Sequence, residues 1–197
     1  RFPDHKIIRF ILKKINFPLA MPSANISSNV SPVCAEDVAD EFKKKIKLII
    51  NGGKSKIGIE STVVDLTGKP NILRPGIISS KLIHKILKTK INTIKAASRL
   101  KSPGMLKKHY SPGIPIILNK ETSNKKFALI TFGKKYKNNK NYFNLSQKSD
   151  LKEAASNLYT TLRKIKKLQF KKIYVVKIPE KGPGIAINDR LKRAAKK

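Results

Sequence analysis

The feature that most constrains the fold is an alternation of strand-like and helix-like segments after residue 113. Strand-like segments, which are short and rich in apolar residues, cover 114–118, 127–132, 173–178 and, more weakly, 142–145. Helix-like segments, with apolar residues recurring on one face, cover 150–167 and 185–195. Strands that alternate with helices are typical of parallel sheets. We therefore predict a small α/β (Rossmann-like) domain with a largely parallel sheet over residues 114–197.

The first 88 residues also combine helices and strands. Pro3 and Asp4 begin a helix whose apolar side chains share one face, and Ser31 and Pro32 begin another. Strands are predicted at 17–21 and 47–50, and 57–66 is predicted to form a hairpin with 72–73. A helix capped by Ser79 or Ser80 follows, up to about residue 88.

Between these parts, residues 89–113 lose periodicity and include SPGMLKKHYSPG, which is bracketed by Pro-Gly turns. A loop of this length without a core of its own is usually functional. We therefore divide the chain into a first domain at 1–88, a linker at 89–113 and a second domain at 114–197.

Two motifs in the first domain combine small hydroxyl residues with Gly or Pro. They are PSAN at 22–25 and GIESTVVDLTGKPNILRPG at 58–76. In such segments backbone amides and hydroxyl groups can approach a phosphate or carboxylate closely, and Arg74 adds a planar cation suited to anionic oxygens. The motifs predict a pocket for a small anion such as a nucleotide. The alternatives are turn chemistry for Ser23 and Asn25, an edge position for Glu60 and a surface ion pair for Arg74. Tyr110, in the linker, either stacks on a base or ribose or is a packing anchor.

Composition narrows the function classes. The net charge of +32 comes mainly from lysines spread along the chain, together with abundant Ile and Asn. A compositional bias that favours Lys, Ile and Asn codons also explains this pattern. The charge therefore predicts salt-dependent, sequence-independent affinity for polyanions rather than specific reading of nucleic acid. The single cysteine, Cys34, excludes an internal disulfide framework and favours a reducing cytoplasm. No apolar run is long enough to cross a bilayer, and no His/Cys/Asp pattern predicts a metal site.

Four segments together resemble the Sua5/YrdC family of threonylcarbamoyl-AMP synthases. They are PSANISSNVSP, the 58–76 motif, SPGMLKKHYSP and the closing GIAINDRLKRAA. They occur in the family's order, and the linker and second domain match the long Sua5 form. The resemblance implies the C-terminal part of a YrdC-like twisted open sheet with helices, followed by a small Sua5-type α/β domain.

The resemblance also implies a nucleotidyltransferase reaction. L-threonine and bicarbonate form a carbamate, which attacks the α-phosphate of ATP and releases pyrophosphate, with Mg²⁺ helping to neutralise charge. The product, threonylcarbamoyl-AMP, passes to a threonylcarbamoyl-transferase complex that makes the t6A modification of tRNA in the cytoplasm. No membrane partner is implied.

Site residues follow from matching motif positions. For ATP the resemblance implies Ser23, Ser31, Arg74 and Tyr110, the linker tyrosine that closes over the nucleotide. For threonine it implies Arg1, Met21 and Thr62, with Asn25 and Ser61 in support; the threonine-contacting hydroxyl is that of Thr62 or Ser61. No residue is assigned as a catalytic acid, base or metal ligand.

The chain begins at Arg1 without the family's N-terminal segment. We therefore expect a fragment that is inactive alone, whose first domain exposes strand edges. Two other functions remain open: a non-catalytic module that binds double-stranded RNA or tRNA, and a YrdC-like carbamoyltransferase domain.

Overall fold

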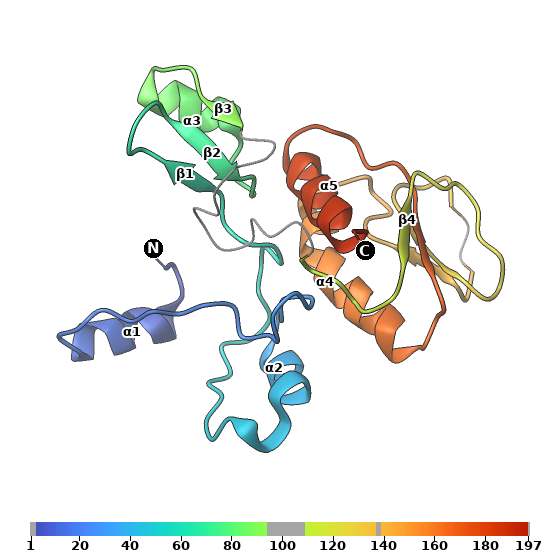
Figure 1. Ribbon diagram of the computed structural model, residues 1–197, viewed down its shortest axis with the longest axis horizontal. Coiled ribbons are helices and arrows are strands. Elements are labelled where there is room, and N and C mark those ends of the chain that lie inside the picture. The colour runs from blue at the N-terminus through green and yellow to red at the C-terminus, as the bar shows by residue number, and fades with distance from the viewer. Residues whose placement is uncertain (1–2, 94–108, 137–138, 197) are drawn as a thin grey trace.

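The structure, a computed structural model, describes residues 3–93, 109–136 and 139–196 (Figure 1). Most of the predicted linker therefore lies outside the described residues, and the division at 88 and 113 remains a prediction. None of the described helices is both long and apolar enough to cross a membrane.

A four-stranded parallel sheet forms the larger part of the molecule, which confirms the prediction for the second half of the chain. Its strand order is β4-β7-β5-β6. The strands are β4 (Ile116–Leu118), β5 (Ala128–Thr131), β6 (Tyr142–Asn144) and β7 (Ile173–Val175). Every residue of β5 is buried, as expected for a central strand of a parallel sheet.

Two helices pack against each other beside this sheet: α4 (Leu151–Lys167) and α5 (Pro183–Ala194). Asp150 caps α4, because its carboxylate accepts hydrogen bonds from the backbone amides of Lys152 (2.6 Å) and Glu153 (2.9 Å). Both helices begin and end within two residues of the predicted bounds. Most of the hydrophobic core lies between them and the sheet.

The first part of the chain is less compact (Figure 1). It contains α1 (Lys6–Lys14), α2 (Ala35–Phe42), the 3-10 turn η1 (Lys43–Lys45) and α3 (Ser80–Leu87), and α1, α2 and α3 have no fully buried side chain. The predicted hairpin is confirmed as β1 (Val63–Asp65) antiparallel to β2 (Asn71–Arg74), and the short β3 (Asn92–Thr93) joins β2 in parallel.

The strands predicted at 17–21 and 47–50 are wrong, since neither segment forms a strand. Leu19, Met21, Leu48 and Ile50 are exposed, and no described strand pairs with these segments. Likewise only 63–65 of the predicted strand 57–66 forms a ladder. The preceding residues instead run against α4: Ile59 joins the main core, and Gly58 has φ +76° and lies close to the backbone of Ser156.

Candidate functional site

Arg74 stands at the end of β2 and is 4% exposed. Its Nε donates a hydrogen bond to the carbonyl oxygen of Ser61 (3.1 Å). The pairing register of β1 and β2 shifts between Val63 and Val64, so the strand is irregular where it leaves the Glu60-Ser61-Thr62 segment. The hairpin therefore places a buried guanidinium directly beside the two candidate hydroxyl residues.

Thr62 is held by the segment that follows β2. Its hydroxyl donates to the carbonyl oxygen of Ile78 (2.8 Å). Gly76 approaches Thr62 so closely that a Cβ at position 76 would overlap the Thr62 backbone nitrogen. The glycine after Pro75 is thus required for this packing against the protein's own backbone, which the sequence did not predict.

Ser31 joins the site through the largely buried carboxylate of Glu60. Its hydroxyl donates to Oε1 of Glu60 (2.7 Å). Oε2 of Glu60 accepts hydrogen bonds from the hydroxyl of Tyr159 in α4 (2.8 Å) and from Nε of Arg190 in α5 (3.0 Å). Three segments far apart in the sequence therefore meet at Glu60, which immediately precedes Ser61 and Thr62.

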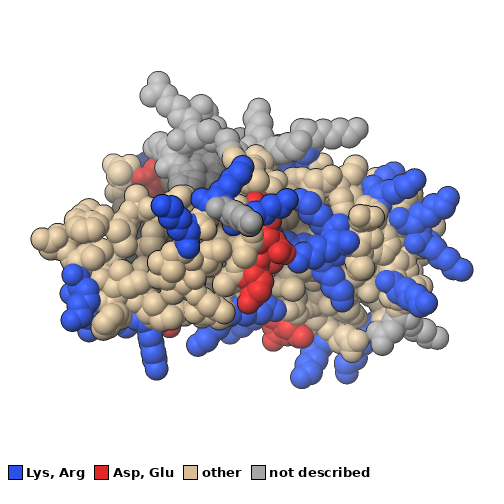
Figure 2. Space-filling model, turned by 90° about the horizontal axis from the view of Figure 1, so that it is seen from below, with Lys and Arg blue, Asp and Glu red and all other residues tan. Residues whose placement is uncertain are grey.

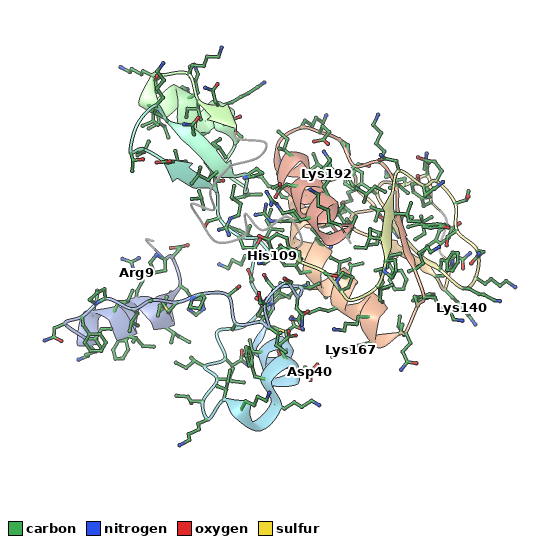
Figure 3. All side chains as sticks on the ribbon, viewed as in Figure 1. Arg9, Asp40, His109, Lys140, Lys167 and Lys192 are labelled. Atoms are coloured by element: carbon green, nitrogen blue, oxygen red, sulfur yellow. The ribbon has the colours of Figure 1, made fainter. Side chains whose placement is uncertain are left out.

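Tyr110 is 1% exposed and adopts φ +61°. Its ring stacks on that of Tyr159 with centroids 5.7 Å apart, and the guanidinium carbon of Arg190 lies 5.2 Å from its centroid. The ring of His109 lies 4.0 Å from it. Figure 3 shows His109 where the first part of the chain meets α5, and its amide donates to the Arg193 carbonyl at 3.5 Å.

The charges of this cluster are coupled. Burial is the largest influence on the pKa of Glu60 and raises it, but Arg190 and the hydrogen bonds from Ser31 and Tyr159 together outweigh burial and lower that pKa below its usual value. Burial lowers the pKa of His109, against the attraction of Glu60. At neutral pH the site therefore holds an ionised Glu60 and a neutral His109.

The PSAN loop is attached to the segment that carries Tyr110. The side-chain amide of Asn25 donates to the carbonyl oxygens of Ile26 (2.8 Å) and Asn29 (3.3 Å). Asn29 forms a bridge with Ser111, whose amide donates to the Ser28 carbonyl at 2.8 Å. Asn25 thus organises the loop internally, and the loop lies next to the residue after Tyr110.

The predicted site residues are therefore placed unequally. Ser31, Ser61, Thr62, Arg74 and Tyr110 lie in one connected cluster. Ser23 and Met21 are exposed, and the Ser23 carbonyl accepts a hydrogen bond from the amide of Asn25. Arg1 lies outside the described residues.

Sequence reasoning missed three members of this cluster: Glu60, Tyr159 and Arg190. Glu60 had a signal, because a carboxylate entering the apolar run 63–64 is unusual for a purely structural strand. Arg190 also had one. It lies on the buried face of α5 with Ala186, Ile187, Leu191 and Ala194, and a charge on such a face requires a partner.

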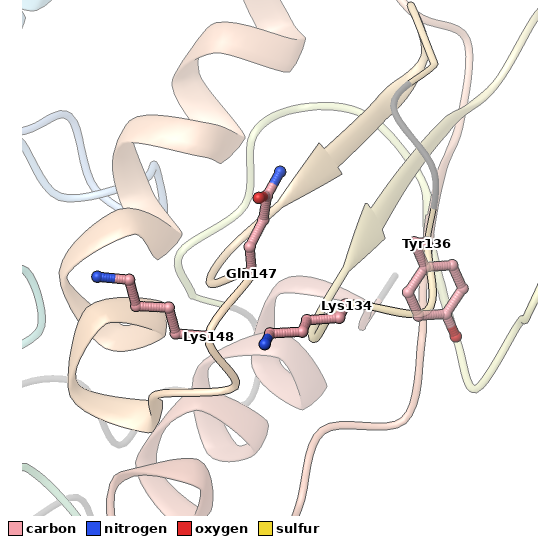
Figure 4. A pocket seen from close by; sticks show the side chains of 4 residues that line it. All are labelled: Lys134, Tyr136, Gln147 and Lys148. Carbon is pink, nitrogen blue, oxygen red and sulfur yellow. The ribbon is translucent and has the colours of Figure 1, made fainter.

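Two hollows lie outside this cluster. One, of about 500 Å³, follows the carboxyl ends of β5 and β6 and is lined by Lys134, Tyr136, Gln147 and Lys148 (Figure 4). The other, of about 310 Å³, lies between α2 and α4, where Asp40 and Lys167 form an ion pair of 2.5 Å (Figure 3).

Within the described residues, no group of three His, Cys, Asp or Glu side chains is placed to hold a metal ion. Lys and Arg side chains are spread over the face shown in Figure 2 rather than gathered in one patch.

The fold and the cluster define a class of α/β protein. In it the β1–β2 hairpin, which carries Arg74, is joined through Glu60 to helices α4 and α5 of the parallel-sheet domain, the part of the chain from 114 onward. Comparison with known families makes this specific. The family model described as "Threonylcarbamoyl-AMP synthase, C-terminal domain" matches residues 78–196, and the model described as "Telomere recombination" (Sua5/YciO/YrdC) matches residues 1–76. The chain belongs to the Sua5-type threonylcarbamoyl-AMP synthase family.

Curated relatives agree. Threonylcarbamoyl-AMP synthase of Pyrococcus abyssi is 32% identical over 99% of this chain and 63% of its own length, and that of Bacillus subtilis is 30% identical over 99% and 62%. The crystal structure of P. abyssi Sua5 complexed with L-threonine superposes with a TM-score of 0.87 at 32% identity, covering 99% of this chain and 63% of that one. The chain thus spans somewhat less than two thirds of these relatives.

Proposed function

We propose that the full-length protein is an L-threonylcarbamoyladenylate synthase. The amino group of L-threonine and bicarbonate form a carbamate with loss of water. A carbamate oxygen then attacks the α-phosphate of ATP, and pyrophosphate leaves. Catalysis of this step is mainly a matter of positioning and charge neutralisation. The observation that carries the proposal is the convergence of Arg74, Ser31 and Tyr110 around the Glu60-Ser61-Thr62 segment in a member of this family.

The proposed roles follow from chemistry and motif position. Ser23, Ser31, Arg74 and Tyr110 bind ATP, since a guanidinium and hydroxyl groups suit phosphate oxygens and an aromatic ring suits a base or ribose. Arg1, Met21 and Thr62 bind threonine, and Asn25 and Ser61 support them. The P. abyssi relative crystallised with L-threonine supports the choice of amino acid.

Mg²⁺ belongs to the same proposal and would arrive with the ATP phosphates, because ATP-dependent enzymes bind it chiefly through substrate oxygens. We also propose that the product passes to a threonylcarbamoyl-transferase complex acting on tRNA in the cytoplasm, and that the division into domains at 1–88 and 114–197 with a closing linker holds for the whole protein.

The test is pyrophosphate release by the full-length protein with ATP, L-threonine and bicarbonate. Arg74→Ala is expected to lower kcat/KM for ATP roughly tenfold to a hundredfold, since a hydrogen bond from a charged group is worth about 1.5–3 kcal/mol. Arg9→Ala is the matched control, because it removes the same charge from an exposed position of α1. Release that does not depend on threonine, or that is unchanged in Arg74→Ala, would reject the synthase.

A non-catalytic RNA-binding role is the second candidate, favoured by the net charge of +32. Binding of double-stranded RNA or tRNA should be the same in Arg74→Ala and Arg9→Ala. If the protein binds RNA but releases no pyrophosphate with any amino acid, this second function replaces the first.

A further inference from the structure

One residue of the helix α5 contacts both Glu60 and Tyr110, namely Arg190. It is 0% exposed and the largest of the fully buried side chains. Its Nε donates to Oε2 of Glu60 (3.0 Å), and its Nη1 to Oδ2 of Asp189 (2.9 Å). A guanidinium this deeply buried is tolerable only with such compensation, so its position is fixed by Glu60 and Asp189.

The same guanidinium supports Tyr110. The guanidinium carbon of Arg190 lies 5.2 Å from the centroid of the Tyr110 ring. The Tyr110 ring also stacks on the ring of Tyr159, with the two centroids 5.7 Å apart. The backbone of Tyr110 has φ +61°, an uncommon conformation for a bulky residue. Surrounding packing must therefore keep Tyr110 in place, and Arg190 and Tyr159 provide it.

Glu60 connects this packing to Ser31. One carboxylate oxygen accepts from Ser31, and the other accepts from Tyr159 and Arg190. Arg190 thus touches both the carboxylate that orients Ser31 and the ring of Tyr110. The hydroxyl of Thr62, in contrast, is held by the Ile78 carbonyl and not by this set of residues.

We propose that Arg190, acting through Glu60, is a positioning residue that holds Ser31 and Tyr110 in the arrangement that binds ATP. This inference rests on the proposed function and assigns the second domain a direct part in forming the nucleotide site. Arg190 contacts Glu60 and Tyr110, whereas the Thr62 hydroxyl is held by the Ile78 carbonyl. Removal of Arg190 is therefore expected to weaken ATP binding much more than threonine binding.

Titration of the full-length protein with ATP alone, and separately with L-threonine alone, tests this split. Arg190→Met is expected to raise the Kd for ATP at least tenfold and to change the Kd for threonine less than threefold. Arg190→Lys, which keeps the charge but not the planar fork, should lie between it and the wild type. Lys192→Met is the matched control, because Lys192 is on the same helix but is exposed and pairs with Glu180 at 2.9 Å; its Kd for ATP should stay within twofold of the wild type.

An Arg190→Met protein with unchanged ATP affinity overturns the inference, and so does a parallel loss of ATP and threonine binding, which would indicate a general structural role. If Arg190→Met does not fold, Arg190→Lys and the Glu60→Gln/Arg190→Met pair, which removes both charges, must show the same split or the inference fails. A wild type that binds ATP but releases no pyrophosphate refutes the proposed function alone, whereas a wild type that does not bind ATP refutes both.

Discussion

Glu60 is the residue on which the described site depends. Its carboxylate is largely buried and accepts hydrogen bonds from Ser31, Tyr159 and Arg190. Burial alone would favour the protonated acid, but the guanidinium and the two hydroxyl groups favour the carboxylate, and the pKa is lowered. The charge of Glu60 is therefore part of what holds the two halves of the structure together.

The first prediction concerns the pH dependence of stability. Because the pKa of Glu60 is lower in the folded state than the usual value of about 4.3, its ionisation stabilises the fold fully above that value, and this stabilisation is lost as pH falls through the folded pKa. The free energy of unfolding of Glu60→Gln should therefore fall less steeply than that of the wild type below about pH 4.3. Urea unfolding followed by circular dichroism at a series of pH values measures this difference.

At neutral pH the same variant should be less stable by about 1.5–3 kcal/mol, because the buried Arg190 loses its charged hydrogen-bond partner Glu60 and keeps only that to Asp189 among its two carboxylate partners. Glu121→Gln is the control. The pKa of Glu121 is also lowered, mainly by its hydrogen bond from Lys135, but the Glu121 carboxylate is exposed. Parallel stability curves for Glu60→Gln and the wild type would show that Glu60 does not hold the site together.

At the scale of elements, the segment before β1 must lie flat on α4 for Glu60 to reach Tyr159 and Arg190. Gly58 makes this contact, since a Cβ there would lie 2.6 Å from the Ser156 Cα and carbonyl oxygen. Its φ of +76° is also one that residues with side chains rarely adopt. A glycine is therefore required for both conformation and close approach.

The second prediction separates these two requirements. Gly58→Ala and Gly53→Ala introduce the same backbone strain, because Gly53 has φ +77°, but nothing lies within 4 Å of a Cβ at position 53. Gly58→Ala should cost about 1–3 kcal/mol more than Gly53→Ala, as overpacking in a tight contact does. Thermal unfolding of both variants gives the comparison, and equal melting temperatures would contradict close docking on α4.

Local signals explain which elements the sequence predicts. The helix α3 begins where Ser79 accepts a hydrogen bond from the Leu82 amide, and the hairpin turns at the predicted 67–70. The segments 17–21 and 47–50 have the apolar content of strands but not the paired neighbour that a strand needs. The convergence of Ser31, Arg74 and Tyr110 depends on contacts between distant segments, so motifs predict its members but not Glu60 and Arg190 as their connection.

At the scale of the whole molecule, burial is uneven. The core consists mainly of residues from 114–197, joined by Val30, Val33, Ile59 and Tyr110. In the first part of the chain, large apolar side chains are exposed: Phe10, Phe17, Leu82 and Ile86. Regions with few buried apolar contacts open at lower free energy than the core of the same protein.

The third prediction follows from this difference. In native-state hydrogen exchange of the chain, amides of β5 and α4 should exchange most slowly, and amides of α1 and α3 should exchange faster by several orders of magnitude. Mass spectrometry of peptides from the two regions measures this. Equal protection of α3 and α4 would show that the first part is stabilised as strongly as the parallel-sheet domain.

The measurement that tests the central claim most directly is photo-crosslinking of the full-length protein with an azido-ATP, followed by peptide mapping. We expect label on peptides that contain Ser31, Arg74 or Tyr110, suppressed by excess ATP and reduced in Arg74→Ala. Label confined to the hollow at Lys134 and Lys148, unchanged in Arg74→Ala, would place the nucleotide in the parallel-sheet domain and contradict the site described above.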